Sequence, residues 1–115
     1  MHELSIAISI VDMAQEEAES RGNVHVEAVH LKLGQLCGVV KEALLSSYEM
    51  ACFATPLEGS QLLIEEIPVE VFCDKCEGPK LLTSIQRFCC PECGSPTPQV
   101  LRGRELEVVA LEIKE

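Results

Sequence analysis

The sequence predicts an α+β fold: two helices on a small mixed, mostly antiparallel sheet, with an inserted zinc-knuckle module of four cysteines. Three observations lead to this prediction. Apolar residues recur at helical spacing in two segments and alternate with polar residues in three others. Two Cys-x-x-Cys pairs, 13 residues apart, precede the last alternating segment. At 115 residues, of which 47% are hydrophobic, the chain is long enough for one ordinary core and a small appendage. We therefore expect a domain at 1–72, completed by a C-terminal strand at 99–115, and a second domain at 73–98.

The first helix is expected from about residue 3 to residue 21. Its first half is apolar nearly all round, so we expect it to be buried on more than one side, against the rest of the chain or a partner. A strand should follow over residues 24–33, where the alternation slips by one residue between Ala28 and Val29. The slip indicates a bulge, or a strand covered on both faces.

The second helix is expected over residues 39–53, because apolar side chains form one stripe there and Pro56 follows. Residues 62–72 alternate like a strand, and Pro68 within them indicates an edge strand or a local break. The segment 106–113 alternates with one slip, like 24–33, so we expect these two strands to share a sheet.

The two Cys-x-x-Cys pairs are the most specific motif. Cys73 with Cys76, and Cys90 with Cys93, each place two thiolates on one tight turn, and a following glycine lets the backbone fold under the sulfurs. Two such turns that face each other supply a closed tetrahedral shell, which suits structural Zn(II). The alternatives are two disulfides or two unconnected turns. Because a closed shell has no position for water, and the chain has no Walker or nucleophile-elbow motif, we do not expect an enzyme.

Three more cysteines lie outside these pairs. Cys89 precedes the second pair and is expected to be a free thiol beside the metal. Cys37 and Cys52 stand among apolar residues and are expected to be small buried side chains.

The charge and hydropathy of the chain restrict the classes of partner it can bind and the cellular compartment in which we expect it. The formal net charge of −10 disfavours nucleic acid, and aromatic residues make up only 3% of the chain. No apolar run approaches the length of a membrane span, and the first residues lack the basic start of a signal peptide. We therefore expect a cytoplasmic protein that binds neither nucleic acid nor membrane. In that reducing compartment, the cysteines act as metal ligands or buried thiols.

The N-terminal tripeptide offers a second metal site. The α-amine of Met1, the imidazole of His2 and the backbone amides of His2 and Glu3 can supply four nitrogens in a plane, which suits transferable Ni(II) or Cu(II). The simpler alternative is a chance histidine at position 2. His25 and His30 are expected to be polar residues on a strand face.

Five segments, taken together and in order, resemble a known family. They are Met1-His2-Glu3-Leu4-Ser5, Leu33-Gly34-Gln35-Leu36-Cys37-Gly38-Val39, the turn at 56–62, the paired knuckles with Cys90-Pro91-Glu92-Cys93, and Gly103-Arg104-Glu105-Leu106. The resemblance is to the HypA family, the nickel chaperones of [NiFe]-hydrogenase maturation, and it runs over essentially the whole chain.

This resemblance implies a nickel-binding domain that uses Met1, His2 and the Glu3 region, and a zinc-binding domain that uses the four paired cysteines. It also implies two partners, the GTPase HypB and the hydrogenase large subunit, and for some members urease maturation proteins. The sequence departs from the family pattern at Cys37, which replaces a more usual serine, and at Cys89, an additional thiol.

Two other classes of function stay open. The second knuckle, Cys-Pro-x-Cys-Gly, also resembles rubredoxin-type iron sites of electron-transfer proteins. The chain could equally be a zinc-ribbon protein adaptor with no transferable metal.

Overall fold

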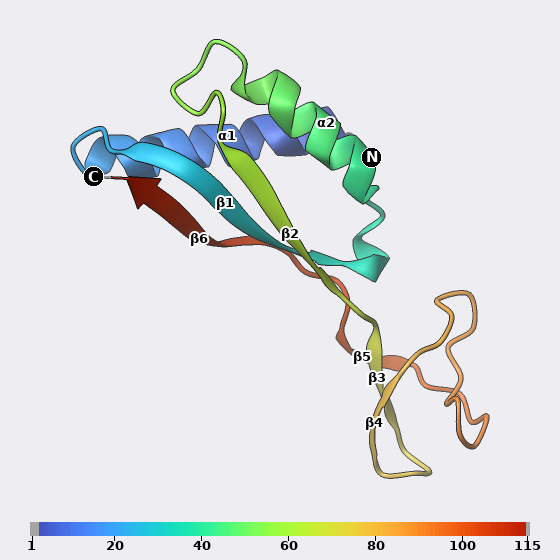
Figure 1. The fold of residues 1–115 in the computed structure, drawn as a ribbon. Helices are drawn as coiled ribbons and strands as arrows, with labels where there is room; N and C mark the ends of the chain where they lie inside the picture. The colour runs from blue at the N-terminus through green and yellow to red at the C-terminus, as the bar shows by residue number, and fades with distance from the viewer. Residues whose placement is uncertain (1–2, 115) are drawn as a thin grey trace. The chain divides into compact units, whose positions relative to one another are not determined.

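The computed structural model describes residues 3–114, and the chain divides into two compact units. The first unit consists of Met1–Lys32, Val39–Glu65 and Glu107–Glu115, and the second of Leu33–Gly38 and Glu66–Leu106. The predicted α+β class is confirmed: two helices accompany small antiparallel and mixed sheets (Figure 1).

Helix α1 spans Glu3–Ser20, close to the predicted range. It ends where Gly22 and Asn23 adopt positive φ, and the N–H of Asn23 bonds back to the carbonyl of Ala18 at 2.9 Å. One face of the helix is buried, and its members are Ala7, Ile10, Val11, Ala14 and Ala18. Leu4, Ile8 and Met13 are exposed, so the chain itself does not bury the helix on several sides, and burial against a partner stays a prediction.

Helix α2 spans Lys41–Cys52 and follows a short 3-10 turn, η1, at Gln35–Cys37. Its buried residues Leu44, Tyr48 and Cys52 recur every four positions, which places them on one stripe. The two helices pack against each other.

The first sheet has the order β2-β1-β6, with β1 at His25–Gly34, β2 at Gln61–Ile67 and β6 at Leu106–Lys114. In Figure 1, β1 and β2 run in the same direction and β6 runs in the opposite one. The expectation that the two slipped strands share a sheet is confirmed. In β1, Ala28 and Val29 are both buried at the predicted slip. The helices and this sheet share a core that includes Val26, Val29, Leu31, Leu44 and Leu57.

Pro68 marks the break between two sheets. The single strand expected at 62–72 is two strands, β2 and β3, and β3 (Glu70–Cys73) is the central strand of the second sheet. Proline lacks the N–H that an unbroken ladder requires. The local break was one of the two expected outcomes, but the second sheet was not foreseen.

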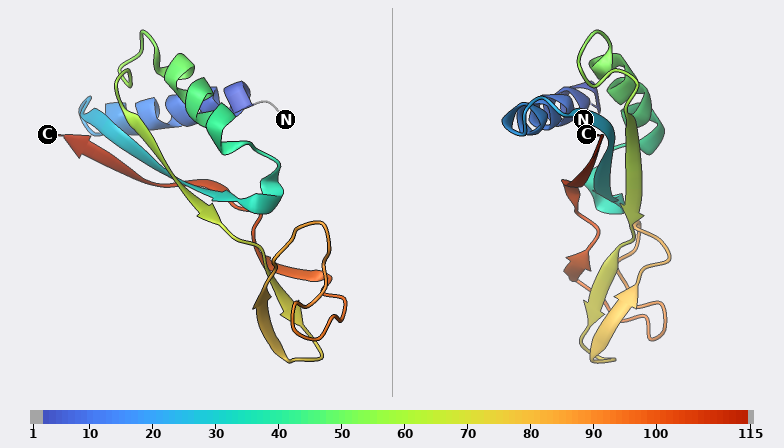
Figure 2. Two further views of the ribbon diagram at one scale, coloured as in Figure 1. Left: turned by 45° about the vertical axis from the view of Figure 1, so that its right-hand side comes forward. Right: turned by 60° about the vertical axis from the view of Figure 1, so that its left-hand side comes forward.

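The second sheet has the order β4-β3-β5, with β4 at Gly78–Leu81 and β5 at Gln99–Arg102. Both outer strands run antiparallel to β3. The register between β3 and β5 shifts at Glu70 and Val71 of β3. Figure 2 shows this sheet and the loops that connect β4 to β5 from two further directions. Strands of four residues show too little alternation to be recognised in a sequence.

The second unit contains 66–72 and 99–106 together with the cysteine segment. The assignment of 1–72 and 99–115 to nickel binding, and of 73–98 to zinc binding, stays a prediction. Neither α1 nor α2 has the length and apolar character of a membrane-crossing helix.

Candidate metal centre

The first knuckle is the turn that joins β3 to β4. Cys73 ends β3 and is opposite Gly78 in the antiparallel register, so the intervening residues fold into a tight turn that contains Cys76. The backbone N–H of Cys76 points at the sulfur of Cys73, at 3.4 Å. The left-handed residue of this turn is Glu77, with φ 56°.

The second knuckle is closed by its own backbone hydrogen bonds. The N–H of Cys90 donates to the carbonyl of Ser95, and the N–H of Gly94 donates to the carbonyl of Cys90, both at 2.8 Å. Gly94 has φ 75°, as the prediction for this turn requires. Cys89 and Pro96 form an isolated antiparallel bridge at its base.

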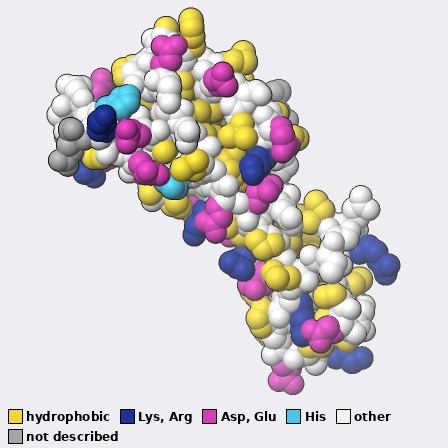
Figure 3. Space-filling model, viewed as in Figure 1, with side chains coloured by type: hydrophobic (Ala, Val, Ile, Leu, Met, Phe, Trp, Pro, Cys, Tyr) yellow, Lys and Arg dark blue, Asp and Glu magenta, His cyan; other side chains and the backbone are white. Residues whose placement is uncertain are grey.

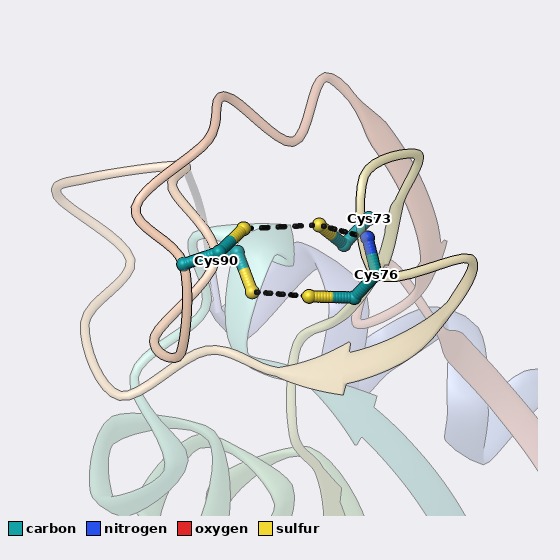
Figure 4. A group of neighbouring side chains, drawn as sticks. Cys73, Cys76 and Cys90 are labelled. Atoms are coloured by element: carbon teal, nitrogen blue, oxygen red, sulfur yellow. Dashed lines mark hydrogen bonds between the residues drawn. The ribbon is translucent and has the colours of Figure 1, made fainter.

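The two knuckles bring their sulfurs together. The sulfurs of Cys73 and Cys93 lie 3.5 Å apart, those of Cys76 and Cys90 lie 3.9 Å apart, and all four lie within 4.8 Å of one another. Figure 4 shows the side chains of Cys73, Cys76 and Cys90 converging on one point. Sulfurs about 2.3 Å from a tetrahedral ion are about 3.8 Å apart, so this spacing fits a metal site made of four cysteines.

The alternatives of disulfides and unconnected turns do not fit this geometry. All seven cysteines are free, and sulfurs 3.5 Å apart are well beyond the length of a disulfide bond. Cys73 and Cys90 are buried while Cys76 is exposed, so the site lies at the surface with one side covered.

Two of the four thiols have strongly shifted pKa values. The pKa of Cys93 falls to about 6, because first the hydroxyl and then the backbone N–H of Ser95 hydrogen-bond to its sulfur. The pKa of Cys76 rises to about 12, because hydrogen bonds to the sulfurs of Cys93 and then Cys73 favour its thiol form. These hydrogen bonds therefore favour the thiolate form of Cys93 and the thiol form of Cys76, whose proton a bound cation would displace.

Sequence reasoning missed Ser95 as a residue of this site. Serine follows glycine in many turns, and nothing in the spacing of the cysteines shows that its hydroxyl faces a sulfur. It also missed the ion pair between Lys80 and Glu92, whose partners are twelve residues apart.

The other cysteines lie outside the cluster. Cys89 is half-buried and is not among the four clustered ligands, in keeping with the expected free thiol. Cys52 is buried at the end of α2, as expected, with its sulfur 3.8 Å from the hydroxyl of Ser60. Cys37 is only half-buried, so its expected burial is only partly met.

The predicted nickel ligands Met1 and His2 lie outside the described residues. Glu3 begins α1, and its carboxylate accepts a hydrogen bond at 3.2 Å from the backbone N–H of Val40, the residue before α2. This bond connects the start of α1 to the start of α2. His25 and His30 lie on β1 as expected, and His30 pairs with Glu112 on β6 at 2.5 Å.

Comparison with known proteins finds relatives that match nearly the whole length of the chain. Residues 1–113 match the model of the family described as hydrogenase/urease nickel incorporation, metallochaperone, HypA. The hydrogenase maturation factor HypA of Chloroflexus aurantiacus is 50% identical over 112 residues, which are 97% of this chain and 98% of that protein. The protein of the same description from Roseiflexus sp. is 44% identical over 100% of this chain and 94% of its own.

Two solved structures share the fold. The solution structure of a HypA protein superposes with a TM-score of 0.71 at 23% identity, covering 99% of this chain and 97% of that one. The solution structure of the Ni metallochaperone HypA from Helicobacter pylori gives a TM-score of 0.64, also at 23% identity, over 98% of this chain and 97% of that one. With the family match over residues 1–113, these likenesses show that the chain belongs to the HypA family of hydrogenase/urease nickel-incorporation metallochaperones.

Proposed function

We propose that this protein binds Ni(II) and delivers it to the large subunit of a [NiFe]-hydrogenase, and that a structural Zn(II) shapes its second unit. The match of residues 1–113 to a nickel-incorporation family carries this proposal. Nickel is the cargo and zinc is the resident ion.

The geometry of the cysteine cluster supports zinc as the resident ion. Four sulfur ligands with tetrahedral spacing suit Zn(II), which imposes no stricter geometry and has no redox chemistry. Zinc held in this way supplies folding energy and activates no water, because every position is taken by sulfur. We therefore assign the protein no enzymatic activity of its own.

The nickel ligands that we propose are the α-amine of Met1, the imidazole of His2 and the backbone amides of His2 and Glu3. Such a site is shallow and depends on pH, because the amine and amides lose protons when the metal binds. Those properties suit a site that must release its ion to another protein.

The proposed partners are the GTPase HypB and the hydrogenase large subunit, and urease maturation proteins where the organism makes that enzyme. The surface is suited to protein partners with basic surfaces: Figure 3 shows acidic side chains spread among hydrophobic ones over the visible face. We propose that the protein acts in the cytoplasm, where seven free thiols stay reduced.

Nickel titration of untagged protein tests this function. We expect about one Ni(II) per chain, a weak yellow absorption and proton release on binding. His2→Ala should abolish uptake at the tripeptide while the zinc content stays the same. His25→Ala is the matched control and should bind nickel like the unaltered protein. Unchanged nickel uptake by His2→Ala would place the cargo site elsewhere.

The same preparation separates the two alternative functions. A rubredoxin-like protein would be red and would contain iron in place of zinc. A zinc-ribbon adaptor would contain zinc, and extending the chain before Met1 would not change its metal binding. A nickel chaperone should lose or reshape its nickel binding when the free amine is blocked in this way.

A further inference from the structure

An ion pair connects the two knuckles at a point other than the sulfurs. Lys80 lies on β4, the strand that leaves the first knuckle, and Glu92 lies in the second knuckle between Cys90 and Cys93. The ammonium group of Lys80 and the carboxylate of Glu92 are in direct contact. The contact therefore joins two segments that separately carry half of the metal ligands.

The two partners of this pair differ in exposure. The Lys80 side chain is 21% exposed and that of Glu92 is 66% exposed. Lys80 is fixed by its strand, where it pairs with Val71 on the central strand β3. The pairing fixes the backbone, and a side chain that is mostly covered has less freedom to lose when it binds a carboxylate. Lys80 is thus the anchored member of the pair.

The second knuckle can be held as a unit through Glu92. Its turn is closed by internal hydrogen bonds, from Cys90 N–H to the Ser95 carbonyl and from Gly94 N–H to the Cys90 carbonyl. A contact at Glu92 therefore fixes the position of both neighbouring cysteines. An exposed ion pair contributes little to stability by itself, so its position beside the ligands is what matters.

Charge gives Lys80 a second effect. Four thiolates around a divalent ion leave a net charge of −2, and a nearby cation lowers the energy of such a centre. The hydrogen bond to Glu92, which also raises the pKa of Lys80, holds the ammonium group beside the second knuckle.

From this arrangement we propose that Lys80 is a positioning residue of the four-cysteine centre, which holds the second knuckle through Glu92 and stabilises the anionic metal–thiolate group. This inference rests on the proposed zinc site. It assigns to Lys80 control over how fast the centre releases its ion.

The test is the rate at which the full-length protein releases zinc to an excess of a chromogenic chelator at fixed pH and low salt. Lys80→Met should release zinc about tenfold faster, the lower end of the loss seen when groups that support metal ligands are removed. Lys80→Arg keeps the charge and the pairing, and should restore the rate to within about twofold of the unaltered protein. The difference between the Lys80→Met and unaltered rates should shrink at high salt.

Lys75→Met is the matched control. Lys75 lies between Cys73 and Cys76, is exposed, and has no ion pair within residues 3–114. The same loss of charge there leaves the contact between Lys80 and Glu92 intact, and should accelerate release clearly less than Lys80→Met does. Equal rates for the Lys75 and Lys80 variants would overturn the proposal.

Glu92→Gln tests whether Lys80 acts through its partner. In the Glu92→Gln protein, Lys80→Met should accelerate zinc release clearly less than it does in the unaltered protein. The effects of two residues that act through each other are not additive. A full tenfold effect there would refute the role of Glu92. Metal analysis of the unaltered protein separates this inference from its basis: absence of zinc refutes the zinc site itself, whereas normal zinc with an unchanged Lys80→Met rate refutes only the inference.

Discussion

Gly34 and Gly103 lie against each other where backbone hydrogen bonds join two segments of the second unit that are far apart in sequence. A Cβ on Gly34 would lie 2.2 Å from the carbonyl oxygen of Gly103 and 2.6 Å from the backbone nitrogen of Glu105. The N–H of Gly34 donates to the Glu105 carbonyl, and the N–H of Leu36 donates to the Gly103 carbonyl, both at 2.7 Å. Gly34 has ordinary backbone angles, so space and not φ requires glycine there.

Gly34→Ala should therefore lower the free energy of unfolding by about 3 kcal/mol, the upper part of the range for overpacking, because backbone atoms cannot rotate away. Chemical unfolding followed by circular dichroism measures the change. Gly78→Ala is the control, since a Cβ at Gly78 meets no atom of the described residues within 4 Å. A Gly34→Ala protein as stable as Gly78→Ala would show that the backbone around Gly103 can move away from the added methyl group.

Cys90→Ser should lose the bound zinc and loosen residues 73–98, because the binding energy of such a site is also folding energy. We expect about one zinc per chain in the unaltered protein by metal analysis, and faster hydrogen exchange across the knuckles of the variant. Cys89→Ser, one residue earlier and outside the cluster, should keep both its zinc and its protection. Full zinc content in Cys90→Ser would argue against a four-sulfur site.

Zinc should be lost as the pH falls, because protons compete with the ion for the four thiolates. The hydrogen bonds from Ser95 lower the pKa of the Cys93 thiol from 9.0 to about 6, which favours the thiolate form that binds the ion. Ser95→Ala removes the largest cause of the shift, so the pH of half-loss should move upward. Zinc retained after dialysis at a series of pH values measures this. Ser84→Ala, in the loop between β4 and the second knuckle, should leave the midpoint where it was.

Thr97→Val should be neutral or slightly stabilising. The Thr97 side chain is 0% exposed, and its buried hydroxyl oxygen has no hydrogen-bond partner among residues 3–114. A buried hydroxyl with no partner carries a desolvation cost, which an apolar group of the same shape removes. The midpoint of thermal unfolding and the zinc content should match or exceed those of the unaltered protein. A destabilised Thr97→Val would reveal a partner for the hydroxyl, such as a buried water.

The sequence alone was enough to predict the helices, two of the strands and the cysteine turns, because each of these is determined by residues close together in the chain. Helical spacing located α1 and α2 within a few residues, and the slipped alternation at Ala28 was enough to place β1 and β6 in one sheet. The two-residue spacing of each cysteine pair predicted two turns with two sulfurs apiece. These properties arise within a few positions of the chain, where side-chain period and turn geometry dominate.

The tertiary structure alone decided which distant residues meet. It divided the strand at Pro68 between two sheets, placed Gly34 against Gly103, brought Ser95 to Cys93 and Lys80 to Glu92, and left Cys89 outside the sulfur cluster. Such pairs leave no periodic pattern, because their separation along the chain has no relation to their distance in space. They depend on how the second sheet and the two knuckles pack, and that packing is set by contacts throughout the second unit.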